Sequence, residues 1–287
     1  MKKATLNPDF YQEMTKKNIG VYTQEEQNRL RDGKVIILGL GGVGGAIAML
    51  CVRSGIGSIS GVDPDTFEVS NLNRQAFATI ESLGQPKSVT AEKCLLEINP
   101  HLNVRFTCAA INEGNAEELL KGHDVVIEAL DDMLSRIIAH RAARKLGIPS
   151  IGMSGSPPHR GFVSTFLPDG IDYETALNLP TLGKSMQDAS IVELVQNIKK
   201  QRAENAVQHG APQDWANDFR EGKVGWIITP IRATLIASFC AHEALQLLIK
   251  QQPLAAAPKG IVINLDNLSA PVSVIDPEGG CWDAGSL

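Results

Sequence analysis

The stretch that most constrains the fold of this chain is a glycine-rich turn set between an apolar run and a helix-like segment. Residues 39–45 read Gly-Leu-Gly-Gly-Val-Gly-Gly. Gly39 permits a sharp turn, Gly41 lets the backbone approach a phosphate, and Gly44 lets the helix pack closely on the strand. The free N–H groups and the positive dipole end of the helix then face an anion. The pattern therefore predicts a strand, a phosphate-approaching turn and a helix.

An acidic residue follows at the spacing expected for a ribose contact. Residues 58–62 read as a second strand, and Asp63 comes directly after it, 19 residues beyond Gly44. A carboxylate at this place accepts hydrogen bonds from ribose hydroxyls. Since the same arrangement serves both NAD and ATP enzymes, these features predict a nucleotide site without deciding between the two ligands.

Polar groups after Asp63 favour ATP. An enzyme that holds a triphosphate needs cations and amides close to the ribose acid, because charge builds on the phosphoryl oxygens during the reaction. Arginine offers a planar fork and lysine a point charge. The residues predicted to bind the nucleotide are Gly39, Gly41, Gly42, Gly44, Asp63, Asp65, Asn71, Arg74, Gln75 and Lys87.

Two of these cations also have simpler interpretations. Lys87 alone could be a solvated lysine in the first turn of a helix, and Arg74 could form a salt bridge with Asp65 or Glu68. Neither interpretation explains why an amide, an arginine, a second amide and a lysine all occur between residues 71 and 87.

Strand-like and helix-like segments alternate from residue 34 to residue 155, and further segments follow. Strands are predicted at residues 35–38, 58–62, 102–106, 123–130, 149–153, 162–166, 260–265 and 272–275. Helices are predicted at residues 24–31, 46–53, 86–98, 117–121, 133–146, 191–206 and 230–250. The alternation is typical of an α/β fold with a doubly wound, mostly parallel sheet (Rossmann-like) and helices on both faces. Ligands in such sheets lie beyond the carboxyl ends of the strands, where the polar groups named above fall.

Two aspartates end the strand predicted at residues 123–130. A carboxylate above a phosphate site suits Mg²⁺, a hard cation that takes one or two carboxylates together with phosphate oxygens. An aspartate at this place could instead cap the following helix. We assign the metal to Asp131 and the cap to Asp132. Arg136 stands four residues after Asp132, which is the spacing of a helical ion pair.

These motifs together resemble the ThiF/MoeB/HesA family, relatives of the ubiquitin-activating enzymes. The resemblance rests on the glycine turn at 39–45, Asp63, Ser-Asn-Leu-Asn-Arg-Gln at 70–75, Gly-Gln-Pro-Lys at 84–87 and Leu-Asp-Asp at 130–132. It implies ATP-dependent adenylation of a substrate carboxylate with release of pyrophosphate, and a catalytic set of Arg74, Lys87 and Asp131. It also implies a homodimer. The substrate carboxylate would belong to a small ubiquitin-like sulfur carrier, a peptide or a modified tRNA.

The chain departs from that family at several places. The family usually has asparagine where Asp132 stands. In relatives an N-terminal arm brings an arginine to the partner's ATP, but residues 1–33 offer only Lys17 as a poor substitute. No cysteine occurs in residues 181–225, where relatives carry a thioester cysteine, and the five cysteines show no CxxC spacing. We therefore expect ATP and Mg²⁺ as cofactors, no zinc and no thioester intermediate.

The organisation and location of the protein follow from its length and composition. Residues 1–33 are predicted to form an arm and a helix, and residues 34–287 a single adenylation domain with a polar helical insertion or lid at 181–225.

The N-terminus lacks an apolar signal core, and no apolar run is long enough to span a bilayer. A formal net charge of −5 argues against a general nucleic-acid binder, although tRNA stays open as a substrate. We expect a cytoplasmic protein with no membrane partner.

Two other functions stay open on the residues alone. An NAD(P)-dependent oxidoreductase is permitted by Asp63, and it predicts dinucleotide binding with no need for Arg74 or Lys87. A non-catalytic nucleotide-binding protein predicts ATP binding without pyrophosphate exchange.

Overall fold

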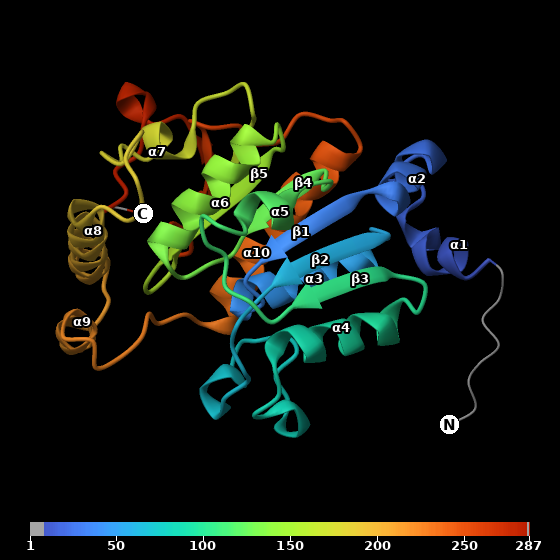
Figure 1. The fold of residues 1–287 in the computed structure, drawn as a ribbon, viewed down its shortest axis with the longest axis horizontal. Coiled ribbons are helices and arrows are strands. Elements are labelled where there is room, and N and C mark those ends of the chain that lie inside the picture. The colour runs from blue at the N-terminus through green and yellow to red at the C-terminus, as the bar shows by residue number, and fades with distance from the viewer. Residues whose placement is uncertain (1–8, 286) are drawn as a thin grey trace.

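An eight-stranded sheet organises the computed structural model, which describes residues 9–285 and residue 287 (Figure 1). Its strand order is β3-β2-β1-β4-β5-β6-β7-β8. Strands β1 to β5 pair in parallel, whereas β6, β7 and β8 join antiparallel at one side. The strands are β1 (Lys34–Leu38), β2 (Ser58–Val62), β3 (Asn103–Thr107), β4 (Val125–Glu128), β5 (Ser150–Ser156), β6 (Arg160–Phe166), β7 (Gly260–Asn264) and β8 (Val272–Ile275). The predicted doubly wound, mostly parallel sheet is confirmed.

Helices cover both faces of this sheet (Figure 1). They are α1 (Phe10–Thr15), α2 (Gln24–Asp32), α3 (Gly42–Arg53), α4 (Lys87–Ile98), α5 (Ala116–Leu120), α6 (Met133–Lys145), α7 (Tyr173–Ala176), α8 (Ala189–Gln208), α9 (Gln213–Arg220) and α10 (Pro230–Leu248). Helices α3, α4 and α10 contribute to the core on one face, and α5 and α6 to the core on the other. None of the described helices is both long enough and apolar enough to cross a bilayer.

The central strand β1 shows why its sequence is a continuous apolar run. Val35 and Ile37 point into the core formed with α3 and α10, while Ile36 and Leu38 point into the core formed with α5 and α6. All of them are fully or almost fully buried. A parallel strand covered on both faces has no polar side, so alternation disappears from its sequence.

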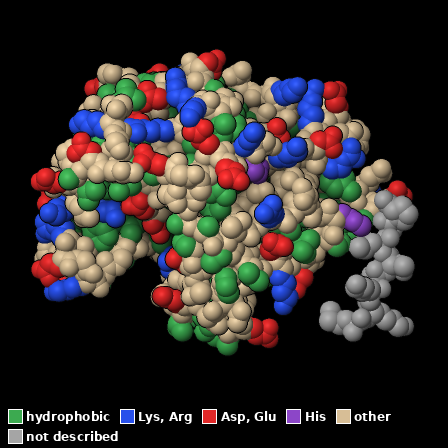
Figure 2. Space-filling view, viewed as in Figure 1, with side chains coloured by type: hydrophobic (Ala, Val, Ile, Leu, Met, Phe, Trp, Pro, Cys, Tyr) green, Lys and Arg blue, Asp and Glu red, His purple; other side chains and the backbone are tan. Residues whose placement is uncertain are grey.

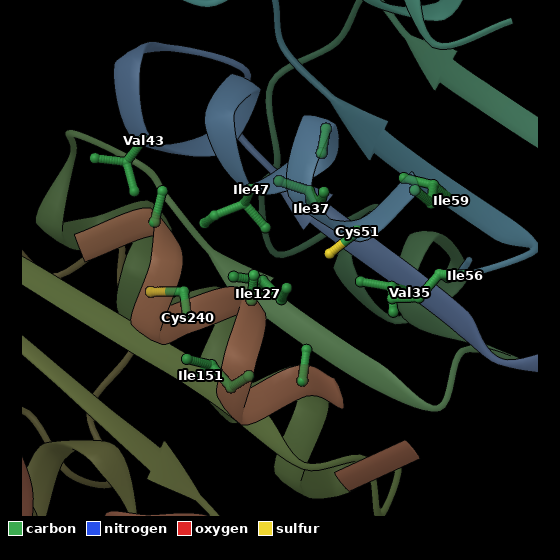
Figure 3. Packing of buried hydrophobic residues seen from close by; sticks show 14 of the residues in the cluster. Val35, Ile37, Val43, Ile47, Cys51, Ile56, Ile59, Ile127, Ile151 and Cys240 are labelled. Atoms are coloured by element: carbon green, nitrogen blue, oxygen red, sulfur yellow. The ribbon is translucent and has the colours of Figure 1, made fainter. Parts of the chain in front are cut away.

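The larger core lies between the sheet and the helix pair α3–α10. Figure 3 shows Ile47 and Cys51 of α3 and Cys240 of α10 gathered over Ile37 and Ile127 of the strands. These side chains have no measurable exposure. Burial of each large apolar side chain stabilises the fold by about 1.5–3 kcal/mol, so this face holds the strands that carry the site in place.

The turn between β1 and α3 is possible only with glycine at two positions. Gly39 has a φ of +90°, and a Cβ there would lie 2.5 Å from the carbonyl oxygen of Ala129. A Cβ at Gly44 would lie 1.9 Å from the carbonyl oxygen of Gly39. The turn therefore packs against its own helix and against the segment that follows β4.

Three short helices, α1, α7 and α9, were not predicted from the sequence. Helix α7 is a single turn in the stretch from 154 to 180, and it begins because Asp172 accepts a hydrogen bond from the Thr175 N–H group. Helix α1 lies in the N-terminal segment. The expectation that the N-terminus lacks an apolar signal core concerns residues 1–8, which lie outside the described residues. The long helix predicted at residues 230–250 is confirmed as α10.

Residues 181–225 contain α8 and α9, which form a lobe beside α6 (Figure 1). The predicted amphipathic helix at 191–206 is α8. Its Ile191, Val195 and Ile198 are buried in a cluster with Ile137 of α6 and Tyr173 of α7. Helix α8 is thus packed on the domain through an apolar face.

Replacing Gly44 by alanine is expected to lower the free energy of unfolding by about 3 kcal/mol or more, because the new methyl group meets a backbone oxygen of the adjacent turn. Gly225→Ala is the matched control, since a Cβ there meets no atom within 4 Å, and we expect a change below about 0.5 kcal/mol. Urea unfolding followed by circular dichroism measures both values. Equal stability of the two variants would contradict the close packing of the turn.

Candidate functional site

The carboxyl ends of β1, β2 and β4 lie at one edge of the sheet. Figure 2 shows the surface indented on this side, between the α8–α9 lobe and the loop that follows β2. The glycine turn, the loop from residue 63 to residue 86 and the segment after β4 all leave the sheet here. The sequence-predicted nucleotide residues belong to these three segments or to the first turn of α4.

Asp63 connects the ends of the first two strands. Its Oδ2 accepts a hydrogen bond of 2.7 Å from the Leu40 N–H group, and its Oδ1 accepts one of 2.9 Å from the Asp65 N–H group. Burial raises the pKa of the Asp63 carboxyl above its ordinary value, although these backbone N–H groups act in the opposite direction. Each carboxylate oxygen keeps a further lone pair, so the side chain can brace the turn and still accept from a ligand hydroxyl.

Lys87 is buried and paired rather than solvated. Its Nζ lies 2.9 Å from Oδ2 of Asp65, and its side chain is 8% exposed against 64% for Asp65. Its backbone N–H group also donates to the Asp65 carbonyl oxygen. The interpretation of Lys87 as a solvated lysine is therefore wrong, because the first turn of α4 is folded back against the loop after β2.

Arg74 lies over the glycine turn. A Cβ at Gly42 would be 3.1 Å from Cγ of Arg74, and the guanidinium donates to the Ser70 carbonyl oxygen and to Oδ1 of Asn73, both at 2.9 Å. Among the residues that the structure describes, no salt bridge joins Arg74 to Asp65 or Glu68. Both acceptors of Arg74 are neutral, so its charge is available to an anion.

The two predicted amides differ in their surroundings. Asn71 is buried and supports the local turn, since its Oδ1 accepts from the Glu68 N–H group and its Nδ2 donates to Oγ of Ser70. Gln75 is 6% exposed, and its Oε1 has no hydrogen-bond partner within the described chain. A buried amide oxygen without a partner is unfavourable by about 1–3 kcal/mol. Gln75 therefore marks a place beside Gly41 where a ligand donor fits.

The two aspartates after β4 have separate environments. Asp132 Oδ2 accepts a 2.8 Å hydrogen bond from the Ser135 N–H group and caps α6, which confirms the predicted cap. Asp131 is exposed beside it and has no capping bond of its own. Gly39 approaches the Ala129–Leu130 peptide bond, so the segment that carries Asp131 adjoins the glycine turn.

Arg136 does not pair with Asp132, and that prediction is wrong. Its side chain turns inward, where Nε donates to the Leu130 carbonyl oxygen at 2.7 Å and lies 3.4 Å from Oε1 of Glu128. Burial lowers the pKa of the Arg136 guanidinium, but the negative charges of Glu128 and Asp131 outweigh this effect and raise it overall. Because Glu128 is fully buried, it needs a cation from inside the fold, and Arg136 supplies it.

The donor set fits a nucleotide triphosphate. The turn that carries Gly39, Gly41, Gly42 and Gly44 contacts Gln75 at Gly41 and Arg74 at Gly42. Asp63 accepts from the Leu40 N–H group of the same turn, and Lys87 pairs with the adjoining Asp65. Asp131 is one exposed carboxylate, which suits Mg²⁺ held partly by phosphate oxygens. Across residues 9–285 and 287 no group of three or more His, Cys, Asp or Glu side chains converges as a metal site.

A second group of polar residues was missed by sequence reasoning. Arg202 of α8 donates a 2.7 Å hydrogen bond to Oγ of Ser154 at the end of β5, and its guanidinium lies 4.9 Å from the ring centre of Trp226. Nothing in the sequence separates Arg202 from the other polar residues of a surface helix. The contact depends on how α8 packs against the sheet, which local patterns do not encode.

The sequence model described as "ThiF family" matches residues 15–279. The chain belongs to the ThiF family. It is 36% identical over 127 residues to a sulfur carrier protein adenylyltransferase of Thermus thermophilus, covering 44% of this chain and 47% of that protein. It is 30% identical over 173 residues to a probable molybdopterin-synthase adenylyltransferase of Porphyra purpurea, covering 55% of this chain and 45% of that protein. The matches thus span less than half of the length of these relatives.

A solved structure of the same fold is that of E. coli MccB with ATP. Its TM-score is 0.65 at 20% identity, with 87% of this chain and 64% of that chain covered. At this identity the likeness shows the fold of this ThiF-family chain, and the site residues above are argued from their own geometry.

Arg136→Met is expected to lower the free energy of unfolding by about 3–5 kcal/mol, because it leaves the fully buried Glu128 carboxylate without its cation. Arg220→Met is the control, since it breaks an exposed pair with Glu204 and should change stability by less than about 1 kcal/mol. Urea unfolding of the two variants separates the buried pair from the exposed one. A small, equal loss in both would refute the structural role of Arg136.

Proposed function

We propose that this protein transfers AMP from ATP to a substrate carboxylate and releases pyrophosphate. The observation that carries the proposal is the grouping of Asp63, Arg74, Gln75 and Lys87 around the glycine turn, where the buried Gln75 oxygen lacks a partner. Its membership of the ThiF family and its similarity to curated adenylyltransferases support the same reaction.

In the proposed reaction the oxygen of the substrate carboxylate attacks the α-phosphorus of ATP, and pyrophosphate leaves with the electron pair of the bond that breaks. The protein provides no nucleophile; it aligns the reactants and neutralises developing charge. Asp63 orients the ribose, the glycine turn contacts the phosphates through N–H groups, and Arg74 and Lys87 hold the polyphosphate. Asn71 and Gln75 assist through their amide N–H groups, while Oε1 of Gln75 accepts from an N–H or O–H group of the nucleotide. Asp131 would hold Mg²⁺, which supplies positive charge to the phosphate oxygens when bound.

A covalent thioester intermediate is not part of the proposal. Cys51 and Cys240 are fully buried, and burial raises the pKa of the Cys51 thiol to about 12 and that of Cys240 well above its ordinary value. A thiol in this environment is a poor nucleophile. We propose that the activated acyl group passes to an acceptor outside the protein.

We further propose the finer features implied by the family resemblance. The substrate carboxylate belongs to a ubiquitin-like sulfur carrier, a peptide or a modified tRNA, and the protein works as a cytoplasmic homodimer without zinc. Residues 34–287 act as one adenylation domain, residues 181–225 act as its insertion or lid, and residues 1–33 form the arm.

The two neighbouring aspartates give a sharp test of the metal role. Asp131→Asn is expected to reduce ATP–pyrophosphate exchange, measured with a panel of candidate carboxylates, by about 100-fold or more through loss of charge stabilisation. Asp132→Asn should leave exchange close to that of the unmodified protein, because asparagine caps a helix as well as aspartate does. Exchange that survives the first substitution and fails with the second would reverse the assignment.

A nucleotide panel followed by thermal shift separates this proposal from an NAD(P) enzyme. We expect Mg·ATP to raise Tm and NAD or NADP to have no effect. Lys87→Met should abolish the ATP shift, because it removes a buried cation next to Asp65. Lys93→Met, an exposed lysine on the same helix, is the control and should keep it. Stabilisation by a dinucleotide that is unaffected by Lys87→Met would favour the oxidoreductase instead.

A further inference from the structure

A cavity of about 790 Å³ lies beside the second half of α6, away from the proposed nucleotide site. Pro168 lines it and follows β6, and the register of β6 with β5 places that end of β6 next to Ser150, where β5 begins. Helix α6 begins after Asp132 and rises 1.5 Å per residue, so Arg141 is about 14 Å along the helix from that cap. Sites for small molecules have volumes of about 300–1,000 Å³. The cavity therefore has room for such a ligand at a place separate from the glycine turn.

The wall of this cavity is held by the side chain of Arg141. Its Nε and Nη2 donate to the two carboxylate oxygens of Glu174 in α7, both at 2.7 Å. Its Nη1 donates to the Lys184 carbonyl oxygen at 2.8 Å, and its Nη2 also donates to the Thr181 carbonyl oxygen at 2.7 Å. A bidentate contact between arginine and a carboxylate is strong and fixes the geometry of both groups. One arginine thus joins α6, α7 and residues 181–185, so the cavity is formed before a ligand arrives.

Two of the three carboxylates around the cavity are engaged within the protein. Glu174 is buried and paired with Arg141. Asp172 begins α7, where its Oδ1 accepts from the Thr175 N–H group at 2.9 Å and its Oδ2 accepts from the Thr175 hydroxyl at 2.7 Å. Burial raises the pKa of the Asp172 carboxyl, but these hydrogen bonds outweigh it and lower the pKa overall. Glu113, the third carboxylate, is exposed and forms no salt bridge with any residue that the structure describes.

Two cations around the cavity also form no salt bridge within the described part of the chain, namely Arg144 and Lys184. Arg144 donates to the neutral Gly170 carbonyl oxygen at 2.8 Å, and its charge lowers the pKa of Asp172 from beyond salt-bridge distance. The lining holds four Lys or Arg side chains and three Asp or Glu side chains, hence a net charge of +1. Figure 2 shows Lys and Arg side chains on the surface over α7 and α6. The charge around the cavity therefore favours an anion.

The inner wall of the cavity is aromatic. The rings of Tyr173 and His140 are stacked with 4.0 Å between their centres and 11° between their planes, and both side chains are almost fully buried. Leu182, which is 60% exposed, and Pro168 add apolar surface on the outer side. A site with apolar walls and a few charged groups suits an organic ligand whose charged group fixes its orientation.

We propose that this cavity is a second ligand site, which binds a small organic anion with a phosphate or carboxylate group on an apolar body. Arg144 and Lys184 meet the anionic group, and the apolar body lies against Tyr173 and Leu182. Arginine offers a planar fork to either kind of anion, and lysine adds a point charge. The site does not depend on the adenylation proposed above, because its lining shares no residue with the glycine turn or with the residues around it.

Isothermal titration calorimetry of the protein with phenyl phosphate and with benzoate tests the proposal. Phenol carries the same ring without a charge at neutral pH and is the matched control ligand. We expect at least one of the two anions to bind with a stoichiometry of one and phenol to bind at least about tenfold more weakly, because it cannot form the charge-assisted contacts. Binding of one anion alone would show which anionic group the site takes.

Replacing Arg144 and Lys184 together by methionine should weaken binding of that anion by about tenfold or more, because both cations that meet its charge are removed. Lys200→Met, an exposed lysine of α8 that does not line the cavity, is the control and should not alter binding. Glu113→Gln should strengthen binding by about two- to fivefold, because it removes an exposed negative charge from the lining. This substitution serves if the double variant fails to fold.

Lys87→Met, in the proposed nucleotide site, should leave binding of the anion unchanged. The inference would be overturned if neither anion bound, if phenol bound equally well, or if the folded double variant bound like the unmodified protein. A Glu113→Gln variant that bound no more tightly, or loss of binding in Lys87→Met, would also overturn it. Because the titration contains no ATP, none of these outcomes bears on the proposed function.

Discussion

The hydrogen bond between the Leu40 N–H group and the Asp63 carboxylate is the interaction on which the site depends. It ties the turn after β1 to the end of β2, and the same carboxylate also orders the loop through the Asp65 N–H group. Asp65 in turn binds Lys87. One buried acid therefore fixes the positions of the glycine turn, the loop and the first turn of α4. The proposed nucleotide site therefore forms where these three segments meet at one edge of the sheet.

The carboxyl ends of β4 and β5, at the same edge of the sheet, depend on a buried arginine. Arg136 neutralises Glu128 and donates to carbonyl oxygens after β4 and near the end of β5. It therefore holds together the strand end that carries Asp131 and the strand end that carries Ser154. A charge placed here is tolerated because its hydrogen bonds and its counter-charge are all internal. Arg136 thus supports the two strand ends beside the proposed nucleotide site.

Most of the nucleotide side of the site could be predicted from the sequence because its motifs are local. The glycine turn, Asp63 and the segment around Arg74 each lie in a short stretch of chain, and the strand–helix alternation places their connections at one edge. The sequence spacing predicted a helical ion pair between Arg136 and Asp132, and this prediction was wrong. The side chain instead turns inward toward the buried Glu128, and no local sequence pattern indicates that rotation. Arg202 was missed for a related reason, since it reaches Ser154 only through the packing of α8 on α6 and α7.

The most direct measurement is a crystal structure of the protein with Mg²⁺ and a non-hydrolysable ATP analogue. We expect the ribose at Asp63, the phosphates against the backbone of residues 41–44 with Arg74 and Lys87 on their oxygens, and the metal at Asp131. An analogue bound away from the glycine turn, or phosphates that leave both Arg74 and Lys87 uncontacted, would contradict this arrangement.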